Sequence, residues 1–197
     1  MAIDVFVMPL ARYWSGDYVS PAMRTAWSLG AAYTMITPDG RIDIPPGQPI
    51  GGRDAPARRR ERVASAPALF RQLRAAFADP PWDEADDGEI GAWRPDARAF
   101  AALLEAIDAR LGRNSTFFGR LLGKAGYAPH LCFAQILLPA TFDTVFLHEG
   151  TPMGSLAVVE RELGALSPDP TTASAHQLMV EAVAEGRRRR LPLIIDT

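Results

Sequence analysis

The chain contains very little cysteine, lysine and histidine. Among its 197 residues there is one cysteine, Cys132, one lysine, Lys124, and three histidines. A lone cysteine forms no internal disulfide, and no second cysteine or suitably spaced histidine joins His130 and Cys132 in a four-ligand zinc site. We therefore expect Cys132 to be a core thiol, and we expect neither a metal nor a cofactor.

Long hydrophobic runs are also missing. No apolar run approaches the roughly 20 residues that a membrane-spanning helix needs. The first residues, Met1 to Val5, lack the basic start and long apolar stretch of a signal peptide. We therefore expect a cytoplasmic protein with no membrane partner.

Basic residues are almost all arginine, 20 of 21, and alanine occurs 32 times. This bias is typical of GC-rich bacterial genomes, so a single arginine is weak evidence for a selected guanidinium. Two arginine runs, 58–62 and 187–190, would have to join on one surface to bind nucleic acid. Since the formal net charge is −2, long-range attraction to a polyanion is absent, and nucleic acid is not the partner we expect.

Length and a hydrophobic content of 48% favour one globular domain spanning residues 1–197. Short stretches of strand-like apolar sequence alternate with segments of helical periodicity. We expect an α+β fold in which one small mixed β-sheet is covered by roughly five to six helices. The expected strands are residues 3–8, 131–138, 145–148 and 191–195.

The strongest helical pattern covers residues 96–111, where Phe100, Leu103 and Ile107 fall on one face. Ser20 followed by Pro21 predicts the start of another helix. Pro67 is expected to interrupt a helical region, and residues 37–56 are expected to form a long loop rich in proline and glycine. The other expected helices cover residues 58–64, 67–77, 117–122, 156–163 and 178–183.

His148 and Glu149 form the candidate catalytic pair. They follow the apolar stretch that begins at Val145 and precede a turn bracketed by Gly150 and Gly154. An imidazole and a carboxylate serve as general base or as ligands near neutral pH. Neighbours in a strand point to opposite faces, so both reach one ligand only if the strand ends before Glu149. The alternative is a polar strand end followed by a helix that Ser155 caps.

A second candidate site follows the first strand. Tyr, Trp and Arg are over-represented among binding hot spots because each combines a large area with a polar group. The alternative is a structural loop whose rings cover the core and whose acidic residue binds backbone amides. The residues of this candidate binding segment are Arg12, Tyr13, Trp14, Asp17 and Tyr18.

Three function classes remain open. The first is a cytoplasmic bacterial protein-interaction module, such as an inhibitory or toxin-neutralising (immunity-type) partner of another protein, for which the segment from Arg12 to Tyr18 would supply the contact. The second is a small enzyme, a hydrolase, that uses His148 and Glu149. The third is a nucleic-acid binder that uses the arginine runs. No complete catalytic motif decides among them.

Overall fold

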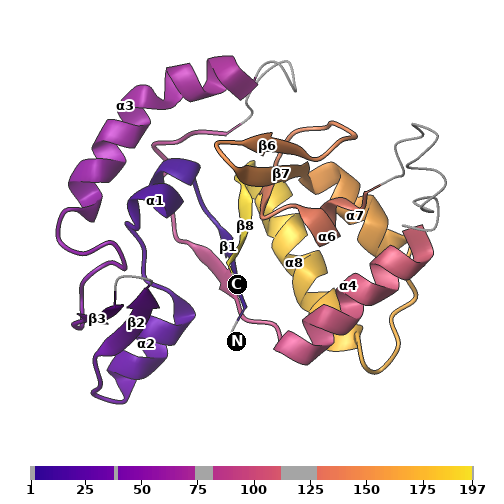
Figure 1. Ribbon diagram of the computed structural model, residues 1–197, viewed down its shortest axis with the longest axis horizontal. Helices are drawn as coiled ribbons and strands as arrows, with labels where there is room; N and C mark the ends of the chain where they lie inside the picture. Colours follow the sequence, from indigo (N-terminus) through magenta and orange to yellow (C-terminus); the bar gives the residue numbers. More distant parts are fainter. Residues whose placement is uncertain (1–2, 38–39, 74–81, 112–127, 197) are drawn as a thin grey trace.

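The computed structural model describes residues 3–37, 40–73, 82–111 and 128–196 (Figure 1). These residues form a mixed six-stranded sheet, a separate two-stranded sheet and seven helices, which confirms the α+β prediction. The helix expected at residues 117–122 lies outside the described residues.

The large sheet has the strand order β4-β1-β8-β5-β7-β6. All neighbouring strands are antiparallel except β5 and β7. The bounds are β1 (Asp4–Val7), β4 (Gly91–Trp93), β5 (Ile136–Leu138), β6 (Phe146–His148), β7 (Thr151–Ser155) and β8 (Leu193–Asp196).

The apolar sequence at 191–195 predicted a strand, and β8 forms one, which lies in the middle of the sheet between β1 and β5. Ile194 pairs with Phe6 of β1 on one side and with Ile136 of β5 on the other. All three side chains are fully buried. Both faces of these strands are therefore covered, and this explains why the strand sequences are continuously apolar instead of alternating.

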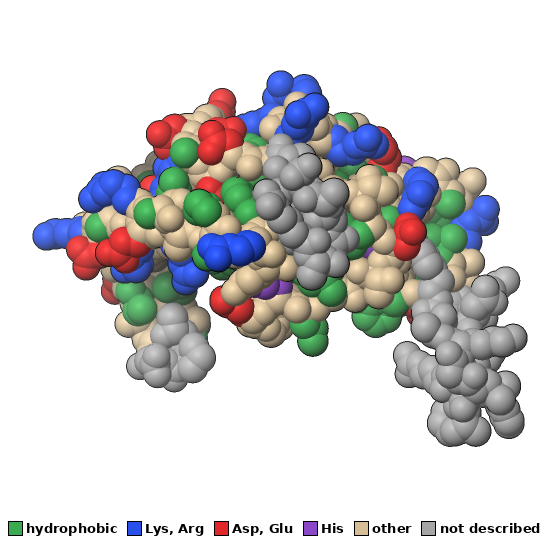
Figure 2. All heavy atoms as spheres, turned by 90° about the horizontal axis from the view of Figure 1, so that it is seen from above, with side chains coloured by type: hydrophobic (Ala, Val, Ile, Leu, Met, Phe, Trp, Pro, Cys, Tyr) green, Lys and Arg blue, Asp and Glu red, His purple; other side chains and the backbone are tan. Residues whose placement is uncertain are grey.

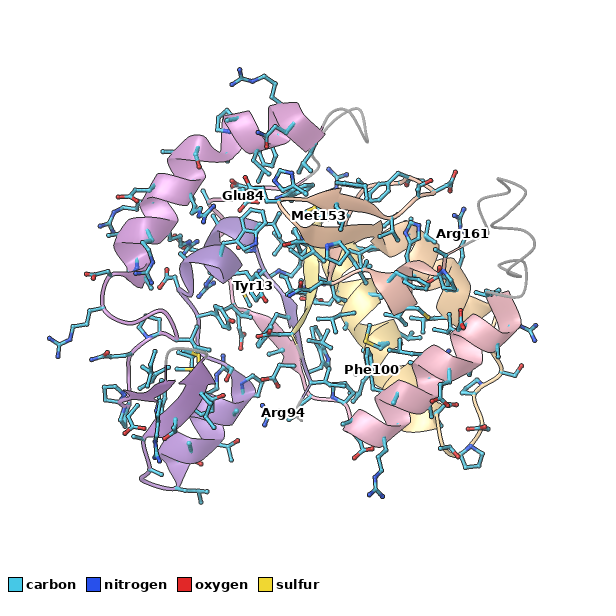
Figure 3. All side chains as sticks on the ribbon, viewed as in Figure 1. Tyr13, Glu84, Arg94, Phe100, Met153 and Arg161 are labelled. Carbon is cyan, nitrogen blue, oxygen red and sulfur yellow. The ribbon has the colours of Figure 1, made fainter. Side chains whose placement is uncertain are left out.

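Helices cover the sheet on both sides (Figure 1). On one side, Phe100 points from α4 (Ala97–Leu111) toward α8 (Ala173–Arg189) (Figure 3). No helix in the described residues is long and apolar enough to cross a membrane. One side carries α4 (Ala97–Leu111), α6 (His130–Phe133), α7 (Leu156–Gly164) and α8 (Ala173–Arg189), and the other carries α1 (Leu10–Ser15), α2 (Pro21–Ser28), α3 (Ala55–Leu73) and the hairpin of β2 (Tyr33–Thr37) and β3 (Gly40–Ile44).

The expected strand at 131–138 is wrong over its first half. Pro129 precedes the short helix α6, and only Ile136–Leu138 form a strand. The side chain of Glu162 accepts hydrogen bonds from the amides of His130 and Leu131 at 2.7 and 3.0 Å, which stabilises the helical turn from a distant part of the chain. Residues 146–148 do form a strand, but it pairs with β7, and β7 separates it from β5.

Three further expectations are corrected. The segment after β1 is the helix α1, Pro67 lies inside a continuous α3, and the hairpin β2–β3 extends to Ile44 into the expected loop of 37–56. Helix α3 packs along α1, and this tertiary contact outweighs the lost hydrogen bond at Pro67.

Helix α8 extends beyond the expected helix at 178–183 in both directions and runs past Gly186. A Cβ atom at Gly186 would lie 3.0 Å from Leu156 Cδ1 and 3.2 Å from the carbonyl of Leu191. The glycine therefore permits close packing against α7 and is not a C-cap. The helix ends at Arg189, and its C-cap residue, Arg190, has a left-handed backbone with φ 54°.

Candidate functional site

The two candidate sites of the sequence meet at one cavity of about 180 Å³. It lies between α1, α3 and the turn that joins β6 to β7. Trp14 comes from the candidate binding segment, and His148 and Glu149 are the candidate catalytic pair. The polar and aromatic part of the lining consists of Trp14, Arg62, Ser65, Gln72, Glu84, His148 and Glu149.

The turn between β6 and β7 explains why both members of the pair reach this cavity. His148 pairs with Thr151, so Glu149 and Gly150 form a two-residue turn. Their φ angles are 49° and 81°. Two positive φ angles are the signature of a type I′ hairpin turn, which normally begins with Asn, Asp or Gly. The strand has thus ended before Glu149, the condition under which the two side chains share a site.

Trp14 connects the cavity to α3. Its ring centroid lies 6.4 Å from that of His148. The guanidinium carbon of Arg62 lies 5.6 Å from the centroid of the Trp14 ring, within the range of a cation–π contact. The ring of Trp14 therefore forms an aromatic wall of the cavity and contacts both the His148 imidazole and the Arg62 guanidinium.

Glu84 contributes a buried carboxyl group that the sequence did not indicate. Its exposed fraction is 3%, although it lies in an acidic stretch of the sequence, residues 83–89. It accepts hydrogen bonds from the amide of Ala11 and the indole of Trp82, both at 2.5 Å. Burial raises the pKa of Glu84, and these hydrogen bonds oppose the rise. Figure 3 shows Glu84 beside α1. Pro9, the residue before this helix, provides no side-chain cap.

Most of the candidate binding segment packs inward. Tyr18 is 6% exposed, and its ring lies 5.1 Å from that of Phe6 and 5.9 Å from that of Tyr13. The hydroxyl of Tyr13 donates to Asp196 at 3.4 Å, and burial raises the pKa of Tyr13 to about 12. The rings of Tyr13 and Tyr18 thus cover the core, and Trp14 is the aromatic residue of the segment that lines the cavity.

The charged residues of the segment are tied to the protein itself. Arg12 donates to the carbonyls of Asp17 and Gly88. The carboxylate of Asp17 lies 3.4 Å from the guanidinium of Arg59. These groups hold the turn after α1 against α3 and residues 86–88.

The arginine runs have similar internal contacts. Arg58 donates to the carbonyls of Ser15 and Gly51, and Arg59 lies 2.6 Å from Asp87. In the second run, Arg187 pairs with Glu160, and Arg188 pairs with Glu185 at 2.6 Å. On the face seen in Figure 2, basic and acidic side chains are interspersed.

A buried histidine lies at the other end of β7. The amide of Ser155 donates to His130 Nδ1 at 2.9 Å, and the Ser155 hydroxyl donates to the carbonyl of Ala140 at 2.6 Å. The expected side-chain cap from Ser155 to α7 is therefore absent. His130 is fully buried, and burial lowers its pKa, with partial opposition from the backbone carbonyl of Asp143.

Cys132 is partly buried on α6 and donates to the carbonyl of Leu104 at 3.5 Å. Burial raises the pKa of its thiol to about 12, so the reactive thiolate is suppressed at neutral pH. Among the described residues, no group of three His, Cys, Asp or Glu side chains is arranged to hold a metal ion.

The turn at Glu149 generates the first prediction. An L-residue other than Asn, Asp or Gly pays about 1 kcal/mol for the left-handed conformation. Glu149→Asn should raise the free energy of unfolding by about this amount, measured by denaturant titration. Glu149→Ala is the control, because it removes the same carboxylate and retains the unfavourable backbone. Equal stability of the two variants would contradict a strained turn.

His130 generates a prediction for pH dependence. Because its pKa is lowered in the folded chain, the unfolded chain binds a proton that the folded chain does not, and stability is lost as the pH falls below about 6.5. His130→Asn retains an acceptor for the Ser155 amide but does not titrate. Between about pH 7 and about pH 5, its free energy of unfolding should fall less than that of the wild type. Parallel pH profiles of the two proteins would refute a contribution of His130 to the pH dependence of stability. Titration of Glu84 does not affect this comparison, because Glu84 is present in both proteins.

No protein-family model, no curated protein and no solved structure matches this chain in comparisons with known proteins.

Proposed function

We propose that the chain is a cytoplasmic bacterial protein-interaction module of the inhibitory or immunity type, and that the cavity beside His148 accepts one side chain of its protein partner. The observation that carries this proposal is the convergence of Trp14, His148 and Glu149 on one small cavity.

The size of the cavity favours a protein partner over a small substrate. Ligand sites typically enclose about 300–1,000 Å³. The volume here is about 180 Å³, which suits a single large side chain. Protein interfaces commonly concentrate their binding energy in such an anchor, inserted into a pocket and surrounded by contacts that exclude water.

The lining favours an anchor with an apolar body and a polar end. Trp14 supplies a ring face, whereas Glu84, His148 and Glu149 supply polar groups at the same cavity. Glu84 also fixes α1 through the amide of Ala11, so Trp14 is presented by a helix whose first turn is held in place. A preorganised wall lowers the entropy cost of binding.

A hydrolase that uses His148 and Glu149 is the second candidate. It is favoured by the presence of Glu84 at the same cavity, because burial raises the pKa of this carboxyl group while Glu149 is exposed. Carboxyl groups in contrasting environments are a common basis for separate acid and base roles.

Site-specific photocrosslinking tests the interaction. A photoreactive residue replaces Gln72, an exposed residue at the cavity, and in the control protein it replaces Gln177, which is exposed on α8. In the native cell, we expect position 72 but not position 177 to crosslink one defined protein. His148→Ala should weaken the purified complex about thirtyfold, which corresponds to about 2 kcal/mol for an anchor contact.

Equal crosslinking from positions 72 and 177 would refute the interaction site, and so would parental affinity of a folded His148→Ala protein. The hydrolase would be supported instead by turnover of an ester or amide panel that both His148→Ala and Glu149→Ala abolish while the melting temperature is retained.

A further inference from the structure

The hairpin of β2 and β3 lies away from the six-stranded sheet (Figure 1). Among the described residues, the only strand that pairs with β3 is β2, so the other edge of β3 has no strand beside it. Its middle residues are exposed: the side chains of Arg41 and Asp43 are 71% and 59% exposed, and Ile42 is 47% exposed. An isolated two-stranded sheet is marginally stable in water, and an unpaired edge offers backbone N–H and C=O groups to another strand.

The sequence of this edge is complementary to itself. If two copies of β3 pair antiparallel about a two-fold axis through Ile42, residue 42 faces residue 42 of the second copy. Arg41 then faces Asp43 of the other copy, and the same pair occurs again on the opposite side of the axis. Opposite charges directly across a strand pair stabilise it, whereas like charges destabilise it.

The side chains within one copy already favour this pairing. Arg41 Nε lies 3.3 Å from Asp43 Oδ1, so both charged groups project from the same face of β3. Thr34 of β2 donates to the same carboxylate at 2.6 Å and accepts from Arg41 at 3.1 Å. Two copies would bring two arginines and two aspartates into one alternating cluster, while the two Ile42 side chains would meet on the opposite face.

We propose that the chain forms a homodimer by antiparallel pairing of β3 with β3 of a second copy, which joins the two hairpins into one four-stranded sheet. A second copy is favoured as the occupant because antiparallel pairing places Arg41 of each copy opposite Asp43 of the other. None of these residues lines the cavity beside His148, so the dimer is independent of the proposed partner site.

Charge reversal tests the pairing on the full-length chain, with sedimentation equilibrium over the micromolar to millimolar range. The wild type should show a reversible monomer–dimer equilibrium. Arg41→Asp and Asp43→Arg each place like charges opposite one another twice, and each should weaken the dimer about tenfold or more. The double variant Arg41→Asp/Asp43→Arg restores both opposite pairs and should recover dimerisation. A mixture of the two single variants should form heterodimers, because one copy then carries two acids and the other two arginines.

Arg161→Asp is the matched control, since Arg161 forms a similarly exposed pair with Asp143 at 3.4 Å away from the hairpin. It should leave the dimer unchanged, and melting temperatures of all variants should confirm folding. A wild type that remains monomeric at every concentration would overturn the proposal. It would also be overturned if the single variants dimerised like the wild type. The same holds if neither the folded double variant nor the mixture of single variants recovered dimerisation.

Discussion

Two buried carboxylates replace the helix caps that the local sequence lacks. Helices α1 and α6 each begin after a proline, and neither preceding residue supplies a side-chain cap. Glu84 accepts from the first turn of α1 across 73 residues of sequence, and Glu162 accepts from the first turn of α6 across about 32. A helix start leaves amide groups without partners, and a carboxylate there also interacts favourably with the helix dipole. These two contacts place Trp14 beside the cavity and His130 beside β7.

The segment that carries Glu84 joins parts of the chain that are far apart in sequence. Its carboxylates and carbonyls bind Arg12 of α1, Arg59 of α3 and Arg189 of α8. Partly buried ion pairs and charge-assisted hydrogen bonds of this kind cost desolvation, but they fix geometry. The acidic stretch therefore links the helices on the two sides of the sheet. Its partners are arginines, although the arginine-rich composition by itself gives little evidence that any single arginine has a role.

Hydrophobic patterns in the sequence predicted helix α4 and strand β8. Helix α4 buries Phe100, Leu103 and Ile107 as their spacing requires, and the apolar run at 191–195 forms β8, whose central position the sequence did not indicate. The sequence did not predict α1, because its stabilising carboxylate comes from a distant residue. It did not predict β7 either, since Thr151–Ser155 contains proline and glycine, and Glu149 gives no local signal for a positive φ angle. The sequence singled out Trp14, His148 and Glu149 in two separate candidate sites, but it indicated neither their shared cavity nor the buried Glu84.

The amide of Ala11 provides the most direct measurement of the central claim, that the Glu84 carboxylate holds α1 and thereby the wall of the cavity. Hydrogen exchange is compared at this amide in the wild type and in Glu84→Ala, with the buried core of α8 around Met179 as the internal reference. The account predicts that Glu84→Ala accelerates exchange at Ala11 and its neighbours in α1 while the α8 amides keep their protection. Unchanged protection at Ala11 in a folded Glu84→Ala protein would contradict it.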